Sequence, residues 1–257
     1  MRPALPTLSK VPEITAAFWI TKVLTTGMGE STSDYLVLTL GPAIAIGLGT
    51  LVFAAALIAQ FRVKRYIAGV YWFAVVMISV FGTMAADVLH VGLGIPYLIS
   101  TIFFAVVLAA IFFAWYRSQR TLSIHSITTR TRELFYWATV LATFALGTAS
   151  GDLTATTFQL GFLGSGILFA VVIALPAIAW WKFRLNAIFA FWFAYVTTRP
   201  LGASFADWMA VSHVRGGLNW GTGPVSLGLS VVILGFVIYL GVSRRTAVRR
   251  LGPAAPA

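Results

Sequence analysis

The aspartates of this chain all lie in one repeated frame, and this repetition limits the possible folds more than any other feature of the sequence. Each Asp follows a Trp by fifteen residues and a Gly by five, and an aromatic residue precedes each Trp. The four copies of this Trp–Gly–Asp frame are Phe18-Trp19…Gly29…Asp34, Tyr71-Trp72…Gly82…Asp87, Tyr136-Trp137…Gly147…Asp152 and Phe191-Trp192…Gly202…Asp207. The sequence is therefore interpreted as a fourfold internal repeat.

The composition around these frames is that of a membrane protein. Hydrophobic residues make up 59% of the 257 positions and charged residues only 10%. Apolar runs recur along the whole chain, and about 20 helical residues are enough to cross roughly 30 Å of hydrocarbon. Near-continuous runs also exclude a transmembrane barrel, whose strands alternate between apolar and polar residues. The absence of cysteine excludes disulfides and thiolate metal sites.

The apolar pattern predicts an all-α membrane protein with eight transmembrane helices, arranged as four parallel helical-hairpin repeats. The predicted spans are 12–33, 36–60, 66–90, 94–116, 133–152, 156–181, 186–208 and 223–243. They group into repeats at about 12–60, 66–116, 133–181 and 186–243 within a single transmembrane domain, 1–257. The short polar start, Met1 to Lys10, does not resemble a cleavable signal, so we expect the first span to be retained.

Basic residues predict the orientation of these spans. Fifteen of the eighteen Lys and Arg fall at the two ends of the chain or between the second and third, fourth and fifth, and sixth and seventh spans. The opposite turns contain only Arg215. By the positive-inside rule both termini are cytoplasmic. The net charge of +11 therefore reflects membrane topology, and we expect no nucleic-acid partner.

The repeated aspartates are candidates for a cation site. Fifteen helical residues rise about 22 Å, so a Trp in the cytoplasmic half of a span places its Asp near the outer end. Asp34, Asp87, Asp152 and Asp207 could then form a ring of carboxylates, which attracts and selects cations. Such oxygen ligands suit hard metal ions such as magnesium, calcium or manganese. The alternative is that Asp34 and Asp152 cap the following helices.

Three further charges fall inside the predicted spans. Lys22 lies three residues after the first Trp and Arg199 seven after the fourth, while Glu30 lies eleven after the first. Unpaired, each would cost several kcal/mol in the bilayer, so we expect Glu30 to pair with Arg199 or Lys22. This pairing could be a structural clamp, or Glu30 could be an exchangeable carboxylate with Lys22 and Arg199 as its counter-charges. The residues equivalent to Glu30 in the other copies are Thr83, Thr148 and Ala203.

The remaining members of the frame favour packing roles. Trp19, Trp72, Trp137 and Trp192 are typical of interfacial anchoring or of the core of a bundle. Gly29, Gly82, Gly147 and Gly202 are expected to allow close helix contacts or bending. Pro200 is predicted to break the seventh span and to free backbone carbonyls.

These patterns favour a transporter or channel for a cation, either a divalent metal or a proton-coupled ion. The sequence contains no P-loop, dinucleotide fingerprint, HExxH or nucleophile elbow, so we expect no enzyme and no cofactor besides a transported divalent cation. The expected partners are the lipid bilayer and the transported ion or small solute, and a homo-oligomer stays open. The alternatives are a carrier for a small organic solute or anion that uses Lys22 and Arg199, and a membrane scaffold or sensor that transports nothing.

Four tandem two-span units, each with a fixed Trp and a Gly/Asp pair, resemble a bacterial family of uncharacterised membrane proteins. That family is built from four copies of a repeat of unknown function. The segments Lys10-Val11-Pro12-Glu13-Ile14-Thr15 and Phe18-Trp19-Ile20-Thr21-Lys22 are similar to its first repeat. The resemblance covers about 10–243 and implies the bacterial inner membrane as the location. It implies no substrate.

Overall fold

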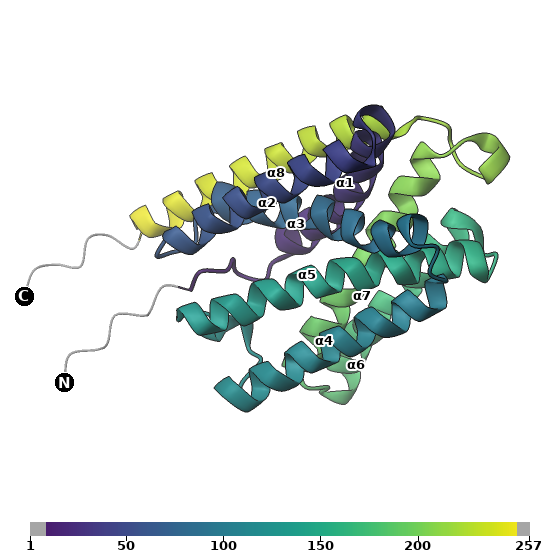
Figure 1. The fold of residues 1–257 in the computed structure, drawn as a ribbon. Helices are drawn as coiled ribbons and strands as arrows, with labels where there is room; N and C mark the ends of the chain where they lie inside the picture. The colour runs from purple at the N-terminus through teal and green to yellow at the C-terminus, as the bar shows by residue number, and fades with distance from the viewer. Residues whose placement is uncertain (1–8, 251–257) are drawn as a thin grey trace, which may run out of the picture.

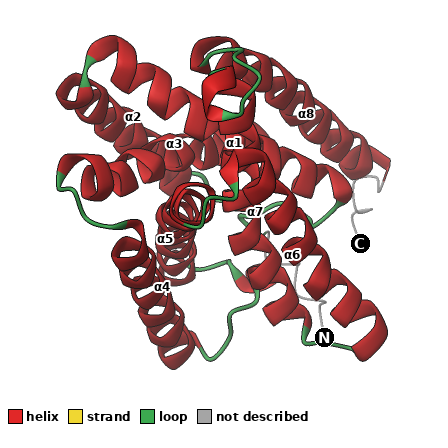
Figure 2. Ribbon diagram, turned by 90° about the vertical axis from the view of Figure 1, so that its right-hand side faces the viewer, coloured by secondary structure: helices red, strands yellow, loops and turns green. Residues whose placement is uncertain are grey.

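The computed structural model describes residues 9–250, and side chains only as far as residue 243. Within this part the chain is helical and has no strand (Figure 2), as predicted. The α-helices are α1 (Ala16–Leu40), α2 (Pro42–Arg62), α3 (Ala68–Asp87), α4 (Tyr97–Gln119), α5 (Arg130–Asp152), α6 (Gly161–Phe183), α7 (Ala187–Ala210) and α8 (Thr222–Arg250). Two π-helical turns, η1 (Val88–Gly92) and η3 (Leu153–Thr157), continue α3 and α5, and short 3-10 turns are η2 (Ile124–Ser126) and η4 (His213–Arg215).

Six of these helices are long and apolar enough to cross a membrane: α2, α3 with η1, α4, α5 with η3, α6, and α8. The other two, α1 and α7, carry the buried charges Lys22, Glu30 and Arg199. The described chain begins at the end of the bundle where α8 finishes (Figure 1). The basic residue Arg2 and the side chains of Arg244, Arg245, Arg249 and Arg250 lie outside the described residues.

The first helical hairpin turns later than its sequence suggests. Helix α1 runs on to Leu40, and the turn falls at Gly41, whose φ of 79° suits a residue without a Cβ. Asp34 therefore lies inside α1, and the N-cap of α2 is Gly41. The N-cap of α6 is Leu160, so Asp152 does not cap that helix either. The capping interpretation of Asp34 and Asp152 is wrong.

The prediction that Pro200 breaks the seventh span is also wrong. Pro200 lies within α7, which is helical without interruption from Ala187 to Ala210. Its Cδ atom lies against Gly147 of α5, so the ring sits at a helix crossing. A proline inside a helix is tolerated where neighbouring helices and hydroxyl groups satisfy the freed backbone groups.

The odd-numbered helices form the centre of the molecule. Helix α1 packs against α3, α3 against α5, α5 against α7, and α7 against α1, so these four helices close a ring. Each even-numbered helix packs outside, against the first helix of the next repeat: α2 on α3, α4 on α5, α6 on α7 and α8 on α1 (Figure 2). In the apolar 18-residue stretch of each helix, 56% of the residues are buried in α3 and 67% in α5, but only between 11% and 22% in the even-numbered helices.

Aromatic contacts close the ring at the end where α1, α3, α5 and α7 begin. The aromatic residue before each repeated Trp contacts the Trp of the next repeat. These pairs are Phe18–Trp72, Tyr71–Trp137, Tyr136–Trp192 and Phe191–Trp19, with ring centroids 5.8, 5.4, 6.2 and 5.6 Å apart. The aromatic–Trp dipeptide of the frame is thus an element that joins one repeat to the next, and packing of large rings stabilises it.

The repeated glycines mark where neighbouring inner helices cross. A Cβ at each position would collide with the residue that stands seven after the Trp in the next repeat. Such a Cβ would stand 1.8 Å from Ser79 Oγ at Gly29, 2.7 Å from Phe144 Cβ at Gly82, 2.2 Å from Arg199 Cγ at Gly147 and 1.9 Å from Thr26 Oγ1 at Gly202. Only glycine allows these backbones to approach so closely. The same contact therefore recurs around the complete ring.

Candidate functional site

Arg199 lies in the middle of the four inner helices. Its side chain is fully buried. Nη1 donates a hydrogen bond to the Thr26 carbonyl of α1 at 2.9 Å. Nη2 donates to Thr148 Oγ1 of α5 at 2.7 Å and to Thr83 Oγ1 of α3. One guanidinium group from α7 thus contacts all three other helices of the ring.

Nη2 of Arg199 also forms an ion pair with Glu30 Oε2 at 2.5 Å. Glu30, Thr83 and Thr148 all stand eleven residues after the Trp of their own repeat. The fourth repeat has the small residue Ala203 at this position. Three repeats therefore supply the oxygen atoms that hold a side chain of the fourth, and the guanidinium fills the central axis, which we define as the line enclosed by α1, α3, α5 and α7.

The Arg199–Glu30 ion pair is not explained by a contribution to folding stability alone. Removing two charges from water costs several kcal/mol each, and a well-packed apolar pair of similar volume is often as stable. Loss of one partner is costly, because the other charge is left buried and uncompensated. Ionisable groups inside a membrane are by default candidates for function.

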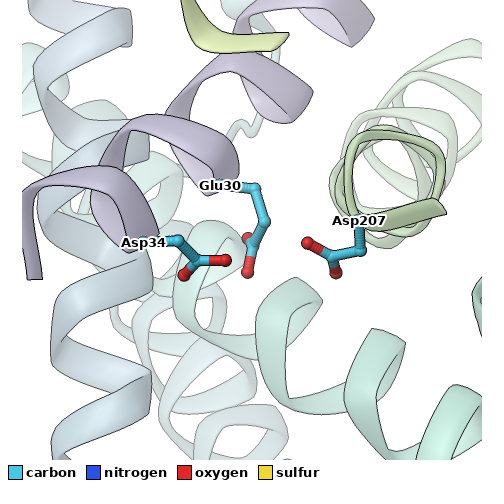
Figure 3. Close-up of side chains that lie close together, drawn as sticks. All are labelled: Glu30, Asp34 and Asp207. Atoms are coloured by element: carbon cyan, nitrogen blue, oxygen red, sulfur yellow. The ribbon is translucent and has the colours of Figure 1, made fainter. Parts of the chain in front are cut away.

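Three carboxyl groups converge beside this pair. One oxygen each from Glu30, Asp34 and Asp207 lies within 4.8 Å of the other two. Figure 3 shows the three groups pointing toward one another, Glu30 and Asp34 from α1 and Asp207 from α7. Glu30 and Asp207 are buried and Asp34 is partly buried. Among residues 9–243, no side chain donates a hydrogen bond to Asp34 or Asp207.

The other two repeated aspartates lie near this group without joining it. Asp87 is within electrostatic range of Glu30, Asp152 and Asp34. Asp152 is within range of Glu30 and Asp34. Each is followed at once by a π-helical turn, η1 or η3, whereas α1 continues as an α-helix past Asp34. Single π-helical turns are rare in proteins, and those that occur are often found at functional sites.

The comparison with protein families agrees with this fourfold arrangement. A family model described as "Repeat of Unknown Function (DUF347)" matches residues 17–66, 70–121, 135–186 and 190–246. The chain belongs to this family. Each matched segment of the DUF347 chain contains one complete Trp–Gly–Asp frame. Neither a curated protein nor a solved structure matches the chain.

Lys22 of the DUF347 chain is placed differently from Arg199. Its ammonium group lies over the Phe144 ring, 4.0 Å from the centroid, and over the Tyr195 ring, 4.3 Å from the centroid. Its Nζ atom has no hydrogen-bond partner among the described residues, and the residue is 1% exposed. The guanidinium of Arg199 lies 5.4 Å from the same Phe144 ring. The two cations therefore share one aromatic neighbour, and only Arg199 pairs with Glu30.

A second buried ion pair lies near the aromatic end and was not predicted. Lys10 Nζ pairs with the fully buried carboxyl group of Glu133, and Gln60 Nε2 donates to Glu133 Oε1 at 3.1 Å. Backbone hydrogen bonds from Lys10 to Ile127 and from Tyr66 to Ser9 hold this segment in place. The available signal was Glu133 itself, one of only three Glu residues and four positions before the third repeated Trp.

Proposed function

We propose that this DUF347 protein is an integral membrane carrier for a cation, which binds between Glu30, Asp34 and Asp207. The observation that carries the proposal is the convergence of these three carboxyl groups within 4.8 Å. Like charges so close together repel strongly where the dielectric constant is low. A bound cation or protons would relieve this repulsion, and the other two aspartates add to the attraction at longer range.

The spacing of the oxygens supports a divalent metal ion as the first substrate class to test. Calcium binds carboxylate oxygens at about 2.3–2.6 Å, so two oxygens on one ion are at most about 5 Å apart. The three carboxyl groups meet this limit as they stand. All donors in the group are oxygens, which suits magnesium, calcium and manganese better than copper. A proton-coupled monovalent ion is the other member of this proposal.

Arg199 supports a carrier in preference to an open channel. Its guanidinium contacts all the other inner helices and closes the central axis next to the carboxylates. A cation that binds Glu30 competes with Arg199 for the same oxygen. Transport would then proceed by exchange: Arg199 releases Glu30 as the cation arrives, and pairs with it again when the cation leaves. No open pore is needed for this cycle.

The proposed orientation places the carboxylates at the outer side and the aromatic ring at the cytoplasmic side. It rests on the connectors 63–67, 120–129 and 184–186, which lie at the end where the basic residues gather. With this orientation both termini are cytoplasmic, and the membrane is the bacterial inner membrane. Because the chain has no cysteine, single cysteines placed in each connector would report the side by labelling with a membrane-impermeant reagent.

Ion flux into proteoliposomes tests the proposal. Purified protein is reconstituted with an entrapped metal indicator or pH dye, and Mn²⁺, Ca²⁺ and Mg²⁺ are added in turn. We expect at least one ion to enter, and we expect Glu30→Gln and Asp207→Asn to lower its flux by about a hundredfold. Glu13→Gln makes the same chemical change at an exposed position outside the cluster, so its flux should match that of the unmodified protein.

The same variants separate the two alternatives. The carrier for an organic solute or anion has one observation in its favour, the buried Lys22 ammonium without a hydrogen-bond acceptor. Flux of an organic solute or anion that survives Glu30→Gln but is lost in Arg199→Ala would favour that carrier. If neither a divalent nor a monovalent cation enters, and no cation raises the thermal stability of the purified protein, the cation proposal fails. If no organic solute enters either, a scaffold or sensor remains. Saturating binding at a hundred times Kd would stabilise the fold by about 2.7 kcal/mol, which is easily measured.

A further inference from the structure

A groove of about 590 Å³ opens between α4 and α7, away from the carboxylate cluster. Phe112, Tyr116 and Arg120, spaced four residues apart, line its α4 side. Phe189, Phe193 and Val196 line its α7 side. The volume is within the range of small-molecule sites, about 300–1,000 Å³. Most of the lining side chains are apolar, five of them aromatic, and the helices α4 and α7 supply two thirds of the lining residues.

The groove opens on the outside of the helix bundle, and this position indicates what can occupy it. Tyr116 is 51% exposed, Phe189 57% and Phe193 36%, so the groove is open along its outer side. α4 is one of the helices apolar enough to cross a membrane. An apolar opening on the outside of such a helix faces lipid chains. From Phe189 to Val196 the α7 wall rises about 10 Å, so an acyl chain would lie along it and reach well into the bilayer.

Arg120 supplies a charge at one end of the groove. It is the C-cap of α4, with a left-handed backbone at φ 56°, and its side chain is exposed. It has no ion pair or side-chain hydrogen bond among the described residues. An unpaired guanidinium at the end of a transmembrane helix complements the phosphate of a lipid headgroup, and basic pockets between helices on the cytoplasmic side bind anionic lipids.

We propose that this groove is a binding site for one anionic phospholipid, with an acyl chain between α4 and α7 and the phosphate on Arg120. This inference goes beyond the proposed transport: it rests on the orientation proposed above, which places Arg120 at the cytoplasmic side, and does not depend on which ion is carried. It also connects lipid to the site, because Val196 lies on the same helix as Arg199 and less than one turn before it. A bound chain would hold α7 against the outer helix α4 and thereby limit the movement of Arg199.

Native mass spectrometry of protein extracted from mixed phosphatidylglycerol and phosphatidylcholine vesicles tests this site. We expect one retained phosphatidylglycerol per chain. Arg120→Gln should lower its retention about tenfold, the loss of one charge-assisted contact. Arg117→Gln is the matched control, because Arg117 is also exposed on α4 but does not line the groove. Val196→Trp should fill the groove and displace the lipid, whereas Val231→Trp on the exposed face of α8 should not.

A second measurement covers variants that fail to extract as folded protein. A single cysteine at Phe193 in this cysteine-free chain reports access to the groove by its rate of alkylation. Phosphatidylglycerol should slow that rate about tenfold relative to phosphatidylcholine, and adding Arg120→Gln should remove the difference. Equal retention by Arg120→Gln and Arg117→Gln would overturn the proposal. So would equal protection of the cysteine by the two lipids.

Discussion

Substituting a repeated glycine tests the helix ring directly. In Gly29→Ala the new Cβ would stand 1.8 Å from Ser79 Oγ and 2.8 Å from the Ser79 carbonyl carbon. Rotation of the serine side chain moves Oγ away but leaves the backbone atom, so α1 and α3 must separate. Overpacking of this kind costs about 1–3 kcal/mol, and alanine recovers up to about 1 kcal/mol through its helix propensity. Because a backbone atom is among the clashing atoms, we expect the steric cost to lie near the upper end of its range. The net loss of folding free energy is then about 2 kcal/mol.

Gly47→Ala is the matched control, because Gly47 is helical in α2 and a Cβ there meets nothing within 4 Å. It should stabilise the protein by up to about 1 kcal/mol. Thermal unfolding in detergent, followed by Trp fluorescence, measures both. At about 2–4 °C per kcal/mol for a chain of this size, Gly29→Ala should lower Tm by about 4–8 °C. Adding Ser79→Gly should restore part of the loss. Equal Tm values for Gly29→Ala and Gly47→Ala would refute the close contact.

Three other substitutions probe the rest of the molecule by the same unfolding measurement. Trp137→Ala should cost about 3–5 kcal/mol because it opens the buried aromatic ring, whereas Trp181→Ala, at a position 76% exposed, should cost far less; equal costs would contradict the ring. Glu133→Ala leaves the partly buried Lys10 ammonium and the buried Gln60 amide without their common partner and should cost about 1–3 kcal/mol, against about 0.5 kcal/mol or less for exposed Glu13→Ala. Lys22→Met removes a buried ammonium without an acceptor at similar volume, so the protein should become no less stable, and a fall in Tm would show that the charge is needed for folding.

The repeat, the helical class and the role of the glycines could be predicted because each depends on periodic local chemistry. A Trp, a Gly and an Asp at fixed spacing in an apolar chain leave few other arrangements. The end of α1 could not be located, because the polar run Ser31 to Asp34 resembles a turn while the chain stays helical as far as Leu40. The enclosing helices stabilise these polar residues inside the bundle, and a sequence read alone does not show what encloses a helix.

The sequence left Lys22 and Arg199 as two possible partners of Glu30, although helix geometry alone excludes Lys22. Lys22 and Glu30 are eight residues apart on one helix, a rise of about 12 Å, so a direct pair is out of reach. The residues Thr83 and Thr148 occupied the positions equivalent to Glu30, but their common contact with Arg199 depends on how the four repeats close around one line. That closure is a tertiary property. The Lys10–Glu133 pair was missed because neither residue belongs to the frame.

The contact between the last and the first repeat is equivalent to the contacts between consecutive repeats. Helix α8 sits on α1 as α2 sits on α3, and Phe191 touches Trp19 as Phe18 touches Trp72. The order in which the repeats are synthesised is therefore not required by the architecture. A circularly permuted gene, opened in the connector 120–129 and joined across the original ends, would encode the same circuit of neighbours, so assembly can be decoupled from the sequence in which the hairpins leave the ribosome.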